Sequence, residues 1–199
     1  MIKIVGITGP SGSGKSLLCK YIAEAGIPCI NADEVYHSML TPPSRCLDAI
    51  AKAFGGGVIL SDGSLDRAAL ASAVFGDTEK LDLLNKTVLP LVIAEIKELI
   101  SGLEEASHTA VAVDAPTLVE SGFHRECDLV VSVIAPPDKR IERIRARDGI
   151  SDEKASLRIS AQKDDDFYTS ASDVTLINDT DDSIFAREAS SLIERIKAL

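Results

Sequence analysis

Five short apolar runs alternate with stretches of helical periodicity along the chain. Residues 2–7, 109–114 and 128–134 are almost continuously apolar, whereas residues 27–30 and 173–177 are shorter and less regular. Strands that alternate with helices are typical of a parallel sheet covered on both faces. Continuous apolar character indicates strands that are buried on two sides, so we expect the three long runs at the centre of the sheet.

A long stretch of mostly helical pattern separates the second and third apolar runs. It contains about eighty residues, far more than one crossover helix needs. Asp66 or Ser64 can cap one helix and Thr78 can cap a second, while Pro90 is expected to start or kink a third. We therefore predict a helical substrate-binding insertion at about residues 34–105.

A second helical stretch follows the fourth run, and we expect it to form a lid at about residues 136–172. One predicted helix runs from Pro136 to about Gly149, and Ser151 caps the next. Two short helices with a glycine between them are typical of a moving lid. The acidic residues 164–166 are expected to end it.

A last helix is predicted after the fifth run, and we expect it to be structural. Its apolar positions are Ile184, Ala189, Leu192, Ile193 and Ile196.

The turn after the first apolar run carries a phosphate-binding pattern. Residues 9–16 read G-P-S-G-S-G-K-S, between a strand and a helix as the motif requires, which disfavours a chance Gly/Ser-rich turn. Glycines allow the tight turn that points backbone N–H groups inward, and the helix start adds positive charge. Lys15 is expected to reach the β and γ phosphates, and Ser16 to hold Mg²⁺. The expected contacts of a nucleoside triphosphate are Gly12, Ser13, Gly14, Lys15, Ser16 and Leu17.

Composition agrees with a cytoplasmic enzyme built as one domain, residues 1–199. The formal net charge of -10 argues against nucleic acid as the main partner, because such proteins need a basic face to displace counterions. No apolar run approaches the roughly 20 residues that cross a bilayer, so no membrane association is expected. The scattered cysteines predict reduced, largely buried thiols without a zinc site or a disulfide framework: Cys19, Cys29, Cys46 and Cys127.

Two acids follow predicted strands, where ligands of open parallel sheets gather. Asp33 comes just after the second run, and it either handles the proton of an attacking hydroxyl or caps a helix over residues 34–40. Asp114 closes the third run and is expected near Mg²⁺ or the acceptor; a role as a helix cap is disfavoured because Pro116 follows. Basic residues crowd positions 139–147. Such a run is usually a solvated helix face, but a triphosphate needs cationic partners, and this stretch is the best candidate for them.

Further motifs follow one another in a specific order. They include Asn31-Ala32-Asp33, Leu65-Asp66-Arg67 with Leu70, Val74-Phe75, Leu89-Pro90-Leu91, Asp114-Ala115-Pro116, Glu120-Ser121-Gly122, Arg143, Arg147-Asp148-Gly149-Ile150-Ser151 and Ala161-Gln162-Lys163. Together with the phosphate-binding loop, they resemble the dephospho-coenzyme A kinase family from the first run to the last helix. The segments at 65–70 and 147–151 have little generic use in a phosphate-loop protein, so they favour this family over kinases in general.

The resemblance implies an α/β P-loop NTPase fold with a five-stranded parallel sheet covered by helices. It implies transfer of the γ-phosphate of ATP to the 3′-hydroxyl of the dephospho-CoA ribose, the last step of coenzyme A synthesis. ATP, Mg²⁺ and this small substrate are then the partners, and a monomer is expected. The catalytic residues would be Asp33, Lys15 and Arg143. Further nucleotide contacts would come from Arg147 and Asn178, the latter equally interpretable as a turn residue. Acceptor contacts would come from Asp33, Arg67, Asp114 and Glu120.

The chain departs from the family pattern at two notable positions. Asn31 stands where the family usually has Asp, and Leu89 where it usually has His. Two alternatives stay open: a kinase for another small hydroxyl acceptor, and a nucleotide-binding regulator that transfers no phosphate. A GTP-dependent switch is disfavoured because no Asn-Lys-x-Asp element is found.

Overall fold

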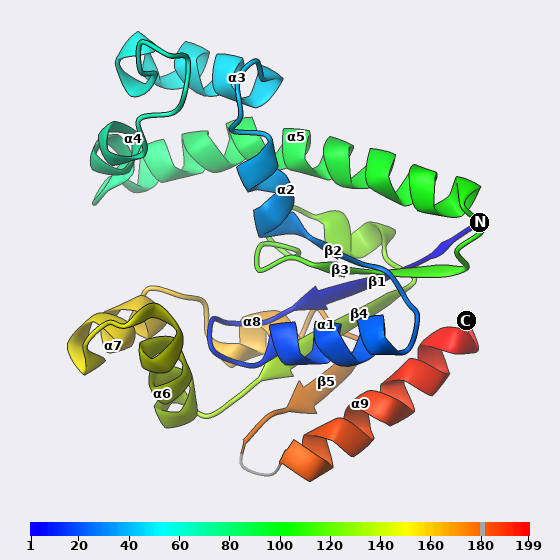
Figure 1. Ribbon diagram of the computed structural model, residues 1–199. Coiled ribbons are helices and arrows are strands. Elements are labelled where there is room, and N and C mark those ends of the chain that lie inside the picture. The colour runs from blue at the N-terminus through cyan, green and yellow to red at the C-terminus, as the bar shows by residue number, and fades with distance from the viewer. Residues whose placement is uncertain (180–181) are drawn as a thin grey trace. The chain divides into compact units, whose positions relative to one another are not determined.

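The computed structural model describes residues 1–179 and 182–199, and these residues form a five-stranded, all-parallel sheet in the order β2-β3-β1-β4-β5 (Figure 1). The strands are β1 (Lys3–Thr8), β2 (Cys29–Asn31), β3 (Ala110–Asp114), β4 (Leu129–Ile134) and β5 (Val174–Ile177). The three long apolar runs are the three central strands, so the predicted sheet is confirmed. Their two-sided burial explains why they lack a polar alternation.

The chain contains two compact units. One consists of Met1–Asn31 and Ile100–Leu199, and the other of Ala32–Leu99. The first holds the sheet and helices α1 (Lys15–Glu24), α6 (Pro137–Asp148), α7 (Asp152–Ser160), α8 (Asp165–Thr169) and α9 (Asp182–Lys197), with the short 3-10 helix η2 (Phe123–Glu126). The second holds α2 (Ala32–Ser38), α3 (Arg45–Phe54), η1 (Gly56–Val58), α4 (Arg67–Val74) and most of α5 (Thr78–Glu105).

Helices α1 and α9 cover one face of the sheet. Their apolar residues pack with those of β1, β3, β4 and β5 into one buried core cluster. On the opposite face, Gly6 leaves room for Leu118 and the sulfur of Cys127, which a Cβ at Gly6 would approach to 2.6 and 2.8 Å. Helix α8 contacts β4. The sheet is thus flanked by helical segments, as the alternation of elements predicts.

Helix α9 differs from the prediction by one residue in its buried face. Phe185, Ala189, Leu192, Ile193 and Ile196 are buried, whereas Ile184 is exposed. The predicted set began at the wrong apolar residue, because two neighbouring apolar side chains at a helix start fit the spacing almost equally well.

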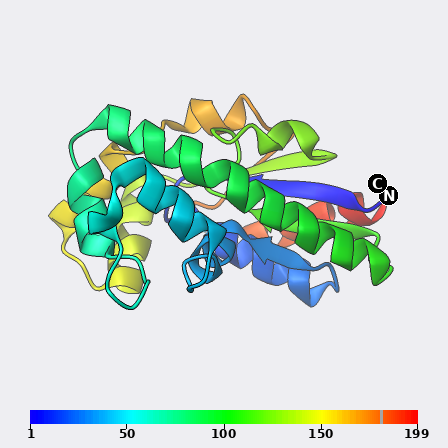
Figure 2. The ribbon, with the colours of Figure 1, turned by 90° about the horizontal axis from the view of Figure 1, so that it is seen from above.

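Helix α5 also differs from the prediction. Residues 78–105 form one helix with Pro90 inside it, so Pro90 starts no separate helix; Figure 2 shows α5 unbroken. Pro90 is exposed, while a buried stripe continues on both sides of it. The stripe consists of Val88, Val92, Ile96 and Ile100. Its four-residue spacing fits a continuous helix. Burial of this stripe stabilises the helix and compensates for the hydrogen bond that is lost because Pro90 has no N–H.

The caps agree with the sequence in part. Asp66 accepts a hydrogen bond from the Ala69 N–H and caps α4, and Ser151 caps α7, both as predicted. Asp77 rather than Thr78 caps α5, since its side chain accepts from the Lys80 N–H. Asp164 caps the short helix α8, so the acidic run starts a helix instead of only ending the predicted lid.

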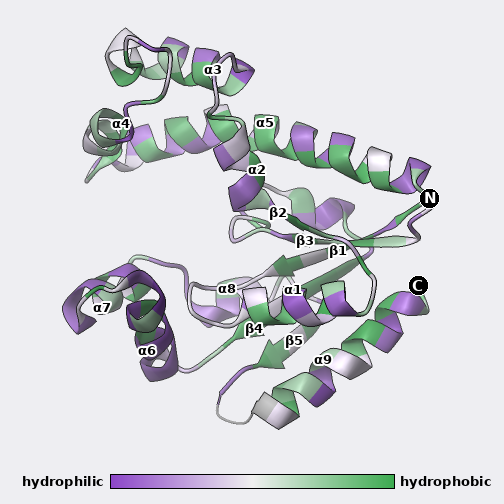
Figure 3. Cartoon of the chain, in the orientation of Figure 1, coloured by the Kyte–Doolittle hydropathy of each residue, from purple (hydrophilic) through white to green (hydrophobic). Residues whose placement is uncertain are grey.

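The four cysteines are free thiols; Cys46 is buried and the other three are partly exposed. Helices α6 and α7 carry mostly hydrophilic residues (Figure 3). Among residues 1–179 and 182–199, no helix is both long and apolar enough to span a membrane.

Substitution of Phe185 tests the observed face of α9. Phe185→Ala should lower the free energy of unfolding by about 3–5 kcal/mol, because it removes a large side chain from the core cluster and leaves a cavity. The matched control, Ile184→Ala, removes an exposed side chain and should cost less than about 1 kcal/mol. Urea unfolding followed by circular dichroism measures both. Equal losses in the two variants would contradict this packing.

Candidate active site

The phosphate-binding loop joins β1 to α1, as predicted. Gly14 has a φ of 110° and directly precedes α1, while Gly9 has a φ of 135° just after β1. A Cβ at Gly9 would lie 2.1 Å from the Val133 carbonyl oxygen, and one at Gly14 would lie 2.0 Å from Asn178 Nδ2. Glycine is required at both positions, for the backbone conformation and for the close approach of neighbouring groups.

Arg143 and Asn178 bind the outer side of this loop. Arg143 Nη1 donates to the carbonyls of Gly12 and Ser13, both at 3.3 Å, and to the carbonyl of Asn178 at 3.2 Å. Arg143 Nη2 donates to Asn178 Oδ1 at 3.0 Å. The buried Asn178 side chain donates from Nδ2 to the Ser13 carbonyl at 2.9 Å. Arg143 of α6 and Asn178, which follows β5, therefore both hold the Ser13 carbonyl, and Arg143 holds the Gly12 carbonyl as well.

This arrangement orients the peptide between Ser13 and Gly14. In a planar trans peptide the C=O and the N–H point in opposite directions. Because Arg143 and Asn178 hold the Ser13 carbonyl, the Gly14 N–H points away from these two side chains. Inward N–H groups at a helix start are the feature that binds phosphate.

The remaining loop residues lie as follows. Lys15 Nζ donates to the carbonyls of Gly9 at 2.7 Å and Pro10 at 3.1 Å, so its ammonium lies within the loop. Ser16 is exposed in the first turn of α1. Leu17 packs its side chain against the core cluster, and its N–H donates to the Gly14 carbonyl. Leu17 can therefore contact a nucleotide only through its own backbone atoms.

Asp114 is buried at the carboxyl end of β3. It is in register with Ile7 of β1 and with Asn31, the last residue of β2. The acid is therefore positioned at the edge of the sheet where the phosphate loop also begins. This placement agrees with the expectation for an acid that follows a central strand.

Asp33 and Arg67 belong to the unit formed by residues 32–99. Asp33 lies inside the first turn of α2, which begins at Ala32, so its predicted role as the cap of a helix over residues 34–40 is wrong. Tyr36, three residues further on, shares its helix face. Burial, the largest effect, raises the pKa of Tyr36, whereas the charge of Arg67 lowers it. Arg67 therefore lies near Tyr36, a residue that the sequence analysis missed because a lone tyrosine carries no pattern.

Glu120 lies in the turn after β3. The residue as a whole is exposed, yet desolvation of its carboxyl raises its pKa, and the charge of Lys163 opposes this effect.

Arg147 pairs with Asp148 at 2.7 and 3.1 Å instead of contacting the phosphate loop. That pairing is the main reason why the pKa of Asp148 falls to about 2, and Arg158 adds to it. Of the predicted nucleotide contacts outside the loop, Arg143 and Asn178 are thus at the loop, whereas Arg147 is turned to its neighbour.

Comparisons with known proteins place the chain among relatives of one kind. Residues 3–183 match the family model described as dephospho-CoA kinase. The dephospho-CoA kinase of Dehalococcoides mccartyi is 39% identical over 164 residues, 82% of either chain. That of Methylococcus capsulatus is 34% identical over 196 residues, 98% of either chain.

Solved structures agree with this result. The protein TT1252 from Thermus thermophilus superposes with a TM-score of 0.81 at 28% identity, covering 98% of this chain and 97% of its own. The dephospho-CoA kinase from Campylobacter jejuni gives 0.70 at 25% identity, with 98% of each chain covered. A shikimate kinase from Acinetobacter baumannii, at 0.55 and 14% identity, shares the fold alone. The predicted P-loop fold is confirmed.

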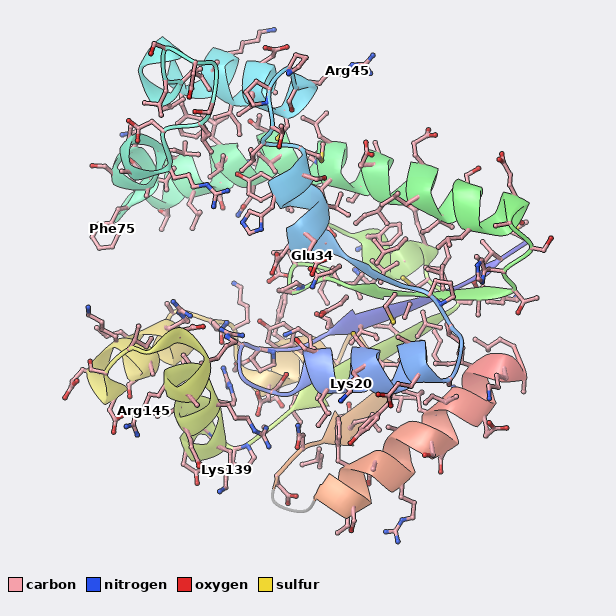
Figure 4. All side chains as sticks on the ribbon, viewed as in Figure 1. Lys20, Glu34, Arg45, Phe75, Lys139 and Arg145 are labelled. Atoms are coloured by element: carbon pink, nitrogen blue, oxygen red, sulfur yellow. The ribbon has the colours of Figure 1, made fainter. Side chains whose placement is uncertain are left out.

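Loss of Arg143 should weaken binding of a nucleoside triphosphate. Arg143→Ala removes charge-assisted hydrogen bonds to the loop carbonyls, each worth about 1.5–3 kcal/mol, so the affinity should fall at least about tenfold. The matched control is Arg145→Ala, which removes the same charge from α6. Arg145 pairs with Asp152 on the side of α6 that faces away from the loop (Figure 4). Calorimetric titration with a non-hydrolysable triphosphate measures both. An equal loss in the control would assign the effect to the charge of α6 as a whole.

Proposed function

The chain belongs to the dephospho-CoA kinase family, and we propose that Lys15, Asp33 and Arg143 carry the phosphoryl transfer of that family. The enzyme transfers the γ-phosphate of ATP to the 3′-hydroxyl of the dephospho-CoA ribose and forms coenzyme A. The observation that carries the assignment is the match of residues 3–183 to the family model, together with a phosphate loop of the required geometry. The roles of individual residues rest on their chemistry and position, as follows.

The loop fits the triphosphate of ATP. The positive φ angles of Gly9, Gly12 and Gly14 allow the tight turn of the loop, and a Cβ at these positions would clash with the neighbouring Val133, Arg140 and Asn178. The Ser13 hydroxyl is fully buried, and within the described part of the chain it has no hydrogen-bond partner. Lys15 supplies a flexible cation at the loop, and Arg143 and Asn178 support it from outside. These features support nucleotide binding by residues 12–17 with Arg143 and Asn178.

We propose that Ser16 holds Mg²⁺. A hydroxyl in the first turn after the loop is a hard oxygen donor, and Mg²⁺ in kinases keeps several waters beside one or two protein ligands and the phosphates. In residues 1–179 and 182–199, no three His, Cys, Asp or Glu side chains form a group that could cage an ion. When bound, Mg²⁺ neutralises charge on the phosphates and aligns them.

Asp33 is proposed to act at the acceptor hydroxyl. As the oxygen–phosphorus bond forms, the 3′-hydroxyl proton passes to the Asp33 carboxylate, and ADP leaves with the electrons of the broken bond. The cation Arg67, near Tyr36 on the same unit, suits a substrate that carries a diphosphate. Asp114 and Glu120 are proposed as further acceptor contacts.

Residues 136–172 are proposed as the lid. Their helices α6 and α7 are strongly polar and are joined at Gly149, which adopts a left-handed conformation at the end of α6. Such a hinge suits closure over the phosphates, which would exclude water as a competing acceptor. Arg147, next to this hinge, is proposed to reach the nucleotide in the closed state. A single domain with an insertion at about 34–105, a monomeric state and a cytoplasmic location stay predictions.

The proposed reaction predicts two products in equal amounts. The protein with ATP, Mg²⁺ and dephospho-CoA should form ADP and coenzyme A in equal amounts, as mass spectrometry would measure. Nucleosides, shikimate or water should give less than about one hundredth of that rate, since a site that hydrogen-bonds its acceptor rejects others strongly. Lys15→Ala is the inactive control. ADP formation with another acceptor, and none with dephospho-CoA, would contradict the assignment.

The role of Asp33 has its own test. Asp33→Asn removes the proton acceptor and should lower kcat by roughly 10²–10⁴, with little change in ATP affinity. Glu34→Gln, the matched control, changes the next carboxylate of α2, which Figure 4 labels, and should keep kcat within about threefold. If Asp33→Asn altered the melting temperature alone, Asp33 would be a structural residue.

A further inference from the structure

The backbone of Ser11 in the phosphate loop is bound on both sides by side chains from the lid. The Ser11 N–H donates to Gln162 Oε1 at 3.1 Å, and the Ser11 carbonyl accepts from Arg140 Nε at 3.0 Å. Arg140 Nη2 also donates to the same Gln162 oxygen at 2.7 Å. Three groups thus close a small ring of hydrogen bonds around one residue of the loop.

This ring attaches both ends of the α6–α7 pair to the loop. Arg140 lies in the first turn of α6, which begins at Pro137, and Gln162 follows the end of α7 at Ser160. The backbone of α6 also presses on the loop, because a Cβ at Gly12 would lie 2.8 Å from the Arg140 carbonyl oxygen. The base of the proposed lid and the loop that binds phosphate are therefore connected through Ser11.

Arg140 is buried, which makes its hydrogen bonds consequential. The residue is 4% exposed, and burial lowers its pKa while Asp165 opposes the shift from 3.8 Å. An arginine keeps its charge in proteins, so each buried N–H group needs an acceptor. Gln162 and Ser11 each supply an acceptor, and Asp165 adds an ion pair at 3.8 Å. Loss of the Gln162 oxygen would remove one hydrogen-bond acceptor from the buried Arg140 guanidinium, and it would also remove the acceptor of the Ser11 N–H.

The contacts require an acceptor at position 162 and use no donor there. Both hydrogen bonds to the Gln162 side chain come from N–H groups, so only an oxygen satisfies them. A glutamate has such an oxygen and its charge would be compensated by Arg140. A methionine has nearly the same length and packing but only a weak sulfur acceptor.

We propose that Gln162 is a positioning residue for nucleotide binding, which holds the turn at Ser11 through its side-chain oxygen together with Arg140. The inference rests on the proposed function for its place in the reaction. The N–H groups that would receive phosphate follow Ser11 in the chain, and a fixed turn pre-organises them before the nucleotide arrives. Preorganised donors bind an anion more tightly because no ordering is needed on binding.

Three variants test this role. Gln162→Met should raise the ATP Kd and the KM for ATP about tenfold, which corresponds to the loss of about one charge-assisted hydrogen bond. The KM for dephospho-CoA should change less than about twofold, because the defect is in the nucleotide site. Gln162→Glu should keep the ATP Kd within about threefold of wild type. Ser160→Ala, which alters the end of α7 without touching the loop, should do the same.

Hydrogen exchange of the Ser11 amide gives a readout that activity does not influence. The amide should be protected in the wild type and in Gln162→Glu, and should exchange at least about tenfold faster in Gln162→Met. An unchanged ATP Kd or an unchanged Ser11 exchange rate in Gln162→Met would overturn the proposal. A defect in Gln162→Glu as large as that in Gln162→Met would overturn it too. Failure of the wild type to form coenzyme A would instead overturn the proposed function. The binding and exchange measurements would still test the positioning role of Gln162.

Discussion

A loop that binds an anion with its N–H groups must turn its carbonyl groups elsewhere, and those carbonyls need donors. In this chain every carbonyl from Gly9 to Ser13 has one. Lys15 serves Gly9 and Pro10, Arg140 serves Ser11, and Arg143 serves Gly12 and Ser13, with Asn178 as a second donor to Ser13. Buried backbone carbonyls without partners would cost free energy, so these donors are a condition for the conformation of the loop.

This requirement explains why a chain with net charge -10 concentrates basic residues on α6. Arg140 and Arg143 are three positions apart, hence on one face of the helix, and both donate to the loop. The remaining basic residues of the run pair with acids of the lid: Lys139 with Glu142, Arg145 with Asp152 and Arg147 with Asp148. The basic run therefore consists of a structural pair, Arg140 and Arg143, which binds the loop, and of three solvated residues that pair with acids. The proposed role of this run in phosphate binding is therefore partly indirect, because Arg140 and Arg143 would shape the backbone that faces the phosphates.

Sequence patterns predicted the elements well and the contacts between them poorly. The strands, the loop and the cap at Asp66 follow from apolar runs, glycine spacing and local hydrogen bonds, each of which involves residues close together in the chain. The exposure of Ile184, the unbroken helix through Pro90 and the place of Asp33 inside α2 depend on how whole elements pack. Gln162 and Ser11 lie 151 positions apart, and no periodicity connects them. The motif around Gln162 marked the segment, but only the fold reveals its partner.

The donors around the loop differ in how easily they can leave it. Arg143 makes four hydrogen bonds and Arg140 is buried, so each planar guanidinium is held by several acceptors at once. Lys15 holds two neutral carbonyls with a flexible side chain and a compact charge. A phosphate oxygen is a better acceptor for an ammonium than a carbonyl, since both partners are then charged. We therefore propose that Lys15 is the donor that exchanges carbonyl oxygens for phosphate oxygens, while the arginines keep the backbone in place.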